Sequence, residues 1–115
     1  MVGKSKPHTK EDKRRFELLP QIGCICCKAY GIHNEWVQIH HIVDGNKRLG
    51  HQFTLPLCYW HHSSHPPEGM TREQAEKIVG PPLTSKKKFN EVFGGEMELL
   101  KYVNKMLELI EENIV

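Results

Sequence analysis

Apolar positions recur at helical spacing near the end of the chain and at alternate places in its middle. Residues 96–114 place seven apolar side chains on one helical face: Leu99, Leu100, Val103, Met106, Leu107, Ile110 and Ile114. This spacing predicts a long amphipathic helix whose apolar face packs in the core or forms a dimer contact. Alternation over 38–43 predicts a strand, and 53–57 predicts the returning strand, with Pro56 at a sheet edge or strand end.

Shorter helices are predicted from capping residues and from helix breakers. They span about 10–19, 59–65, 72–79 and 86–93. Thr9 and Thr71 are suitable N-caps, each followed at the third helical position by a side chain that can complete a capping box. Proline or glycine follows each helix, with Pro20 and Gly23 ending the first one. A β-hairpin followed by helices indicates an α+β fold.

Length and composition limit what this fold can be. The chain has 115 residues, of which 38% are hydrophobic, so it forms one domain with a small core. A structural metal would support such a core. No apolar run reaches the roughly 18 residues of a membrane span, and the first residues lack the apolar region of a secretory leader. The four cysteines suit metal binding and a free thiol better than disulfide bonds, which indicates a reducing cytoplasm.

The net charge is only +2, but the basic and acidic residues are unevenly distributed along the chain. The first fifteen residues are rich in basic side chains: Lys4, Lys6, Lys10, Lys13, Arg14 and Arg15. The last twenty are rich in acidic ones: Glu96, Glu98, Glu108, Glu111 and Glu112. This asymmetry predicts that the front of the chain meets a polyanion, although a solvated tail is the alternative. Residues 1–9 are expected to form a disordered basic arm ahead of a single domain over 10–115.

Two short pairs of metal-ligand residues predict a closed zinc site. Cys24 and Cys27 form the first pair, and Cys58 and His61 form the second. Three thiolates and one imidazole complete a tetrahedral site, whose binding free energy, on the order of 10 kcal/mol, acts as folding free energy. The alternative is that the cysteines are reduced, buried and apolar. Cys26 is expected to pack inward, to be an exposed thiol, or to replace a neighbour as ligand.

Several histidines remain beside this predicted zinc site. His40 and His41 are adjacent on a strand and therefore point to opposite faces. His62 and His65 are three residues apart and would share a helical face. His40, His62 and His65 could hold a second, open metal site, with His41 as a base. A divalent ion held by imidazoles could act as a Lewis acid, and Mn²⁺, Ni²⁺ or Zn²⁺ would compete with Mg²⁺ there.

Several motifs together resemble those of the HNH family of ββα-metal nucleases. They are Cys24-x-x-Cys27, His40-His41-Ile42-Val43 and Thr54-Leu55-Pro56-Leu57-Cys58-x-x-His61-His62. The segments Arg48-Leu49-Gly50-His51 and Gly80-Pro81-Pro82-Leu83 extend the resemblance to the phage recombination-enhancement, RecA-dependent nucleases. It covers roughly residues 20–105, with a zinc-stabilised ββα-metal core, similar to a treble clef, at about 24–66 and a C-terminal helical part at about 71–115.

The resemblance implies a DNA endonuclease acting in phage recombination, in the cytoplasm of a bacterial host, with a RecA-type filament as partner. It makes His40 and His62 the ligands of the catalytic ion and His41 the general base. The position of the family's hairpin asparagine falls near residues 53–54, so His51 or Asn46 would take its positioning role. His65 would be the distal ligand.

Two basic residues, Lys47 and Arg48, lie on the predicted hairpin, where they would meet backbone phosphates. The competing hypothesis is a non-catalytic zinc module that binds nucleic acid or protein. A redox role for Cys24 and Cys27 is weak, because no βαβ pattern surrounds them.

Overall fold

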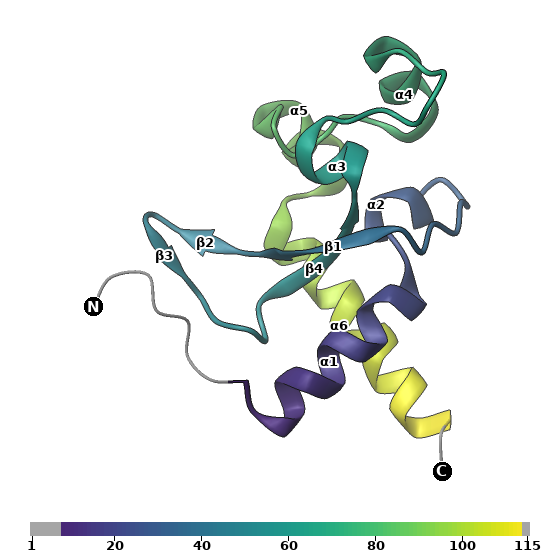
Figure 1. Ribbon diagram of the computed structural model, residues 1–115. Helices are drawn as coiled ribbons and strands as arrows, with labels where there is room; N and C mark the ends of the chain where they lie inside the picture. The colour runs from purple at the N-terminus through teal and green to yellow at the C-terminus, as the bar shows by residue number, and fades with distance from the viewer. Residues whose placement is uncertain (1–7, 114–115) are drawn as a thin grey trace.

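The computed structural model describes residues 8–113, which form an α+β structure of helices and short antiparallel strands (Figure 1). The helices are α1 (Lys10–Ile22), α2 (Ile25–Lys28), α3 (Tyr59–Ser63), α4 (Arg72–Val79), α5 (Lys86–Phe93) and α6 (Glu96–Asn113). The strands are β1 (Val37–His41), β2 (Val43–Asp44), β3 (Lys47–Arg48) and β4 (Thr54–Cys58). No helix within the described stretch is long and apolar enough to cross a bilayer.

Two antiparallel ladders form one long, bent hairpin. β1 pairs with β4 so that His40 lies opposite Leu55, and β2 pairs with β3 beyond a break at Ile42. The two sides of the hairpin stay hydrogen-bonded at this break, because Ile42 N–H donates to the Phe53 carbonyl oxygen at 2.9 Å. The predicted strand over 38–43 is therefore two strands. The β2–β3 end projects from the body of the molecule (Figure 1).

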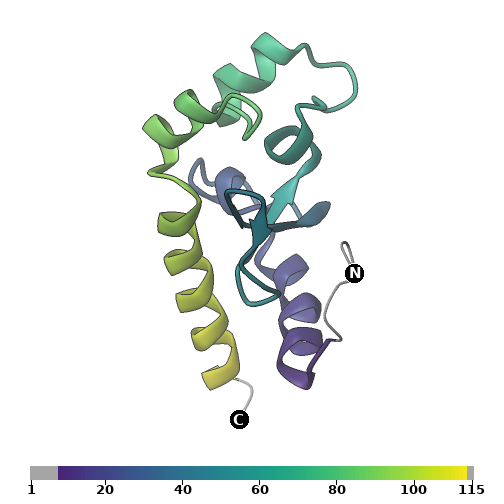
Figure 2. The same cartoon turned by 90° about the vertical axis from the view of Figure 1, so that its left-hand side faces the viewer.

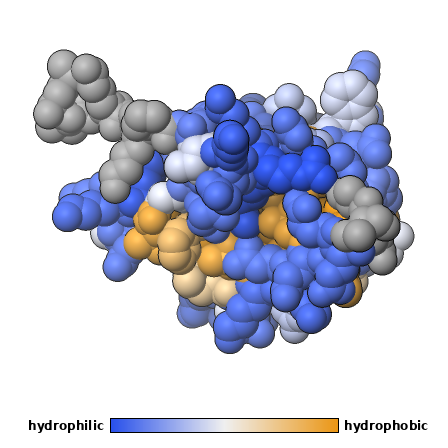
Figure 3. All heavy atoms as spheres, turned by 90° about the horizontal axis from the view of Figure 1, so that it is seen from below, coloured by the Kyte–Doolittle hydropathy of each residue, from blue (hydrophilic) through white to orange (hydrophobic). Residues whose placement is uncertain are grey.

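Strand β4 lies at the centre of the small core. All five of its residues are buried, and α1, α2, α3 and α6 all contact it. The predicted apolar face of α6 packs here through Leu99, Leu100 and Val103, which confirms the core interpretation for those positions; Ile114 lies outside the described residues. Figure 2 shows α1 and α6 descending on either side of the hairpin. Seen from below, a band of apolar side chains remains visible between polar ones (Figure 3).

The capping boxes at Thr9 and Thr71 are both present, and α4 and α5 have the predicted bounds. The first helix is longer than its predicted end at about residue 19. Pro20 lies inside α1, which continues to Ile22, and the second predicted end residue, Gly23, is the C-cap with a φ of 81°. A proline near the end of a helix costs only one backbone hydrogen bond, so the following glycine decides where α1 stops.

Most of the predicted basic arm, residues 1–7, lies outside the described residues, and the ring of His8 contacts Phe16. Arg15, one of the cations expected to meet a polyanion, has a buried side chain instead. Its guanidinium donates to the Thr54 hydroxyl at 2.7 Å, to the Thr54 carbonyl at 2.6 Å and to Asn104 Oδ1 at 2.8 Å. Arg15 thus ties α1 to β4 and α6.

Replacing Arg15 by methionine should lower the free energy of unfolding by about 2–3 kcal/mol, because it leaves buried acceptors on β4 without their charged donor. Arg14→Met is the matched control. Its guanidinium is exposed and pairs with Glu111 at 3.1 Å, so its loss should cost less than about 1 kcal/mol. Urea unfolding of the zinc-loaded proteins measures both. Equal losses would contradict the structural role of Arg15.

Candidate metal and catalytic centre

The two predicted ligand pairs meet at one buried point between α2, β4 and α3. Cys24 caps α2 and Cys27 lies in its first turn, while Cys58 ends β4 and His61 follows in α3. The four ligand atoms all lie within 4.8 Å of one another, and all four side chains are buried. The x-x spacing works because each pair begins at the cap of a short helix and closes within its first turn.

Distances within this cluster fit a tetrahedral zinc ion. With Zn–S near 2.3 Å and Zn–N near 2.0 Å, a tetrahedron has edges of about 3.8 Å between sulfurs and about 3.6 Å between sulfur and nitrogen. The Cys27 and Cys58 sulfurs are 3.8 Å apart. Nδ1 of His61 lies 3.2–3.6 Å from the three sulfurs. These residues can therefore hold a metal ion such as zinc.

Hydrogen bonds and charge around the cluster also suit a cation. Nε2 of His61 donates to the Val79 carbonyl oxygen at 2.7 Å, which turns Nδ1 toward the sulfurs. Hydrogen bonds from Cys26, Cys27 and Cys58 hold the pKa of Cys24 well below its usual range, which favours the thiolate. Cys26 is fully buried in the core, and burial raises the pKa of its thiol. Of the three predicted possibilities, inward packing, an exposed thiol or replacement of a neighbouring ligand, the structure favours inward packing.

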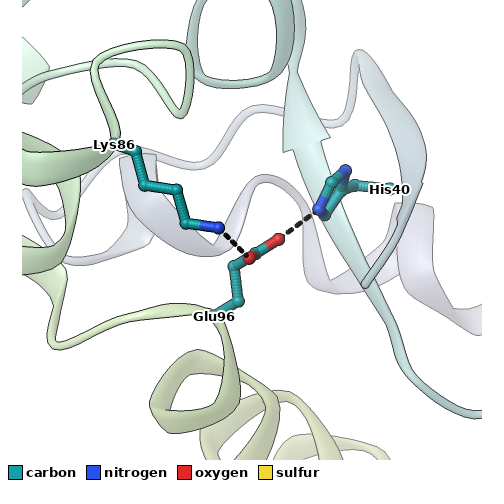
Figure 4. Close-up of polar contacts among 3 residues, drawn as sticks. All are labelled: His40, Lys86 and Glu96. Atoms are coloured by element: carbon teal, nitrogen blue, oxygen red, sulfur yellow. Dashed lines mark hydrogen bonds and ion pairs between the residues drawn. The ribbon is translucent and has the colours of Figure 1, made fainter. Parts of the chain in front are cut away.

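Beside the cluster, His40 and His62 face one another. Their ring centroids are 5.2 Å apart, although they come from β1 and α3. Nε2 of His40 is hydrogen-bonded to Oε1 of Glu96, in the first turn of α6 (Figure 4). Nδ1 of His62 lies 2.7 Å from Oε1 of Gln38. The structure thus brings together the two histidines on which the predicted open site depends.

Glu96 is a site residue that sequence reasoning missed. Its carboxylate is mostly buried, bonds His40 and lies 3.5 Å from Nζ of Lys86 at the start of α5 (Figure 4). The hydrogen bond from His40 holds the pKa of Glu96 below its usual range. In the sequence, Glu96 looks like an ordinary acidic residue at a helix start. Nothing in the spacing signals a partner 56 residues away.

His41 contacts a different set of groups from His40, as expected for neighbours on a strand. Its Nε2 lies 3.1 Å from Nδ1 of His51, and its ring meets Phe16 edge-on. The pKa of His41 is lowered, chiefly by burial and then by the charge of Arg48. A neutral imidazole at neutral pH can accept a proton.

His65 was predicted to lie in the same helix as His62, and this position is wrong. Helix α3 ends at Ser63 because Ser64 adopts a left-handed conformation with φ 65°, so His65 lies beyond the helix and is exposed. It does not share a helical face with His62. Within residues 8–113, Cys24, Cys27, Cys58 and His61 form the group of three or more close ligand atoms, and His65 belongs to no such group.

Three of the remaining predicted residues lie on the surface. Lys47 and Arg48 form β3 in the projecting hairpin, and both are exposed. Asn46 is exposed in the turn before them, whereas His51 contacts His41. Of the two candidates for the positioning role, His51 is therefore the one beside the predicted base.

One known family matches most of the chain. A family model described as "recombination enhancement, RecA-dependent nuclease" matches residues 8–108, which include both ligand pairs, the paired histidines and Glu96. The name of the family implies a hydrolase acting on nucleic acid. The chain belongs to the recombination enhancement, RecA-dependent nuclease family.

Proposed function

We propose that the protein is a metal-dependent endonuclease of the HNH type that hydrolyses DNA phosphodiester bonds during recombination. The observation that carries the proposal is the approach of His40 to His62, with ring centroids 5.2 Å apart, beside a cluster suited to zinc. Support for a ββα-metal core comes from the order β1, β4, α3, in which an antiparallel pair leads into the helix that carries His62.

A second divalent ion would be held by imidazole nitrogens. Such a donor set suits Mn²⁺, Ni²⁺ or Zn²⁺ better than Mg²⁺. His40 and His62 would hold the ion, and His65 stays a predicted third ligand. Once bound, such an ion acts as a Lewis acid on a phosphate oxygen and stabilises the leaving oxygen. The Cys24 cluster already has four ligands and so suits a structural role.

His41 would take the proton from the attacking water. Because Nε2 of His41 is engaged by His51, we assign the transfer to Nδ1, for which residues 8–113 show no hydrogen-bond partner. Burial and the charge of Arg48 lower the pKa of His41 and so keep the ring neutral and able to act as a base. His51 would hold the ring in position, the role that an asparagine has in the family pattern.

Lys47 and Arg48 would bind backbone phosphates. We expect the double variant Lys47→Ala, Arg48→Ala to weaken DNA binding without regard to sequence. The slope of log K against log salt should fall by about 1.8, at roughly 0.9 per lost contact. A double variant at Lys101 and Lys105 is the control, since these exposed lysines pair with acids on α6. Fluorescence anisotropy at several salt concentrations measures the slope; an unchanged slope would remove these residues from the interface.

The family name also suggests a recombination partner. We propose that a RecA-type filament on DNA presents the substrate in a phage or its bacterial host. Cleavage that rises when the filament is assembled on the DNA would support this partner. Equal cleavage of bare DNA would remove it without affecting the hydrolytic proposal.

The second candidate function is a non-catalytic zinc module that binds nucleic acid or protein. One observation favours it: within residues 8–113, the close ligand group is the four-residue cluster, which has no open position. Metal analysis combined with nicking of supercoiled DNA distinguishes the two functions. One tightly held zinc, plus a weaker ion that switches nicking on, supports the nuclease. One zinc and no nicking with any divalent ion supports the binding module.

A further inference from the structure

Both histidines of the proposed catalytic site are held at one ring nitrogen by a side-chain oxygen. Oε1 of Glu96 bonds Nε2 of His40, and Oε1 of Gln38 lies 2.7 Å from Nδ1 of His62. A carboxylate and an amide oxygen only accept hydrogen bonds, so the proton belongs to the ring nitrogen in each pair. In a neutral imidazole, the opposite nitrogen then carries the lone pair.

We propose that Glu96 and Gln38 are positioning residues that fix opposite tautomers of His40 and His62. The tautomers leave Nδ1 of His40 and Nε2 of His62 as the two ligand atoms. This inference rests on the proposed function for the use of those atoms. The tautomers themselves are a property of the protein without a catalytic ion, so they can be measured separately.

The zinc cluster of the same protein provides an internal precedent. Nε2 of His61 donates to the Val79 carbonyl oxygen at 2.7 Å, and Nδ1 lies beside three sulfurs. Here the acceptor on one nitrogen selects the other as ligand, as is general for metal-binding histidines. His40 and His62 show the same arrangement of one anchored nitrogen, with side-chain acceptors in place of a backbone carbonyl.

The surroundings of Glu96 suit an anchor. The side chains of His40 and Glu96 are 15% and 11% exposed, so little water competes for their hydrogen bond. Lys86 lies 3.5 Å from the second carboxylate oxygen, and the start of α6 favours negative charge. Both carboxylate oxygens therefore have partners, which argues for an anchor of His40 rather than a direct ligand.

Gln38 is held in a comparable way. Its amide oxygen also accepts from the hydroxyl of Ser63 at 3.3 Å, next to His62 in α3. The hydroxyl of Ser63 and Nδ1 of His62, both on α3, thus contact the same amide oxygen of β1.

Nuclear magnetic resonance of ¹⁵N-labelled, zinc-loaded protein tests the tautomers directly. At about pH 9, well above the ordinary histidine pKa, we expect the proton of His40 on Nε2 and that of His62 on Nδ1. Glu96→Ala should return His40 to a mixture of tautomers and leave His62 unchanged, and Gln38→Ala should do the reverse. Glu98→Ala, which removes an exposed glutamate of the same helix, is the control and should change neither.

Two results of this measurement would overturn the inference. The first is a His40 proton on Nδ1, or a His62 proton on Nε2, in the parent protein. The second is a tautomer that does not respond to loss of its anchor in a variant that retains its zinc and its thermal transition. The spectra require no DNA and no cleavage.

Calorimetric titration of Mn²⁺ into the same proteins tests the use of these atoms. Glu96→Ala and Gln38→Ala should each weaken Mn²⁺ binding by about 10- to 100-fold. Glu96→Gln keeps an acceptor oxygen and should recover most of the affinity. Equal losses in Glu96→Gln and Glu96→Ala would make Glu96 a direct ligand and overturn its positioning role. Absence of Mn²⁺ binding by the parent would overturn the assignment of ligand atoms.

The inference and the proposed function can fail separately. Anchored tautomers and Mn²⁺ binding without DNA cleavage would reject the nuclease and leave the positioning roles intact. DNA cleavage by a protein whose His40 proton is on Nδ1, or whose His62 proton is on Nε2, would support the nuclease and reject the positioning roles.

Discussion

Replacing His41 by alanine is expected to preserve DNA binding and to reduce metal-dependent cleavage by about 10²- to 10⁴-fold, the usual contribution of a general base. Binding should persist because the exposed cations of β3 are untouched. The ion should remain bound because His40 and His62 are still present. Nicking of supercoiled plasmid measures the rate, and anisotropy with labelled DNA measures binding.

His33→Ala is the matched control for this variant. His33 is an exposed histidine that pairs with Glu35, so its removal should leave the nicking rate within about twofold. Nicking by His41→Ala at the parent rate would reject the assignment of the base. Loss of DNA binding together with cleavage would make His41 part of the binding surface instead.

Removing the zinc, or one of its ligands, should unfold the domain. A structural zinc contributes on the order of 10 kcal/mol, which is comparable to the total stability of a small domain. Cys58→Ala should therefore lose its zinc and its cooperative thermal transition, as should the parent protein after chelation. Circular dichroism and metal analysis measure the two losses.

Cys26→Ala is the control for the zinc prediction. Cys26 is buried next to the cluster but belongs to the core and not to the ligand group. Its loss should cost about 1–2 kcal/mol and leave the zinc in place. A Cys58→Ala protein that melts like Cys26→Ala would contradict a structural metal at this site.

A zinc ion in the cluster would also orient the proposed ligand His62. Helix α3 has five residues, too few to be stable alone, and it carries both His61 and His62. Binding of an ion by Cys58 and His61 would hold the helix at its start and middle. His62 would then be oriented by the structural ion, so chelation should abolish cleavage even when the catalytic metal is restored afterwards.

Local features of this fold could be predicted from the sequence. The capping boxes at Thr9 and Thr71, and the glycines after α4 and α5, mark helix ends because capping involves residues three or four positions apart. Of the two residues predicted to end the first helix, Gly23 does so and Pro20 does not, because a helix tolerates proline near its end. The left-handed Ser64 had no sequence signal.

Residues of the candidate site that are close together in the sequence could be predicted, and a distant one could not. Cys24 with Cys27, and Cys58 with His61, are pairs within one helical turn, so their spacing indicated a shared ion. Glu96 reaches His40 from a distant helix, and no periodicity marks such a contact.

The burial of Arg15 could not be predicted, for a similar reason. It lies in a run of cations, and only the tertiary contacts with Thr54 and Asn104 distinguish a buried arginine from its exposed neighbours.

Binding of Mn²⁺ to the zinc-loaded protein tests most directly whether His40 and His62 share one ion. Calorimetry should give one site per chain in the parent. His40→Ala and His62→Ala should each weaken that site by at least about 100-fold, and the double variant should lose little more, because removal of either ligand already disrupts the same site. Parent-like Mn²⁺ binding in either single variant would contradict a shared ion and with it the hydrolytic mechanism.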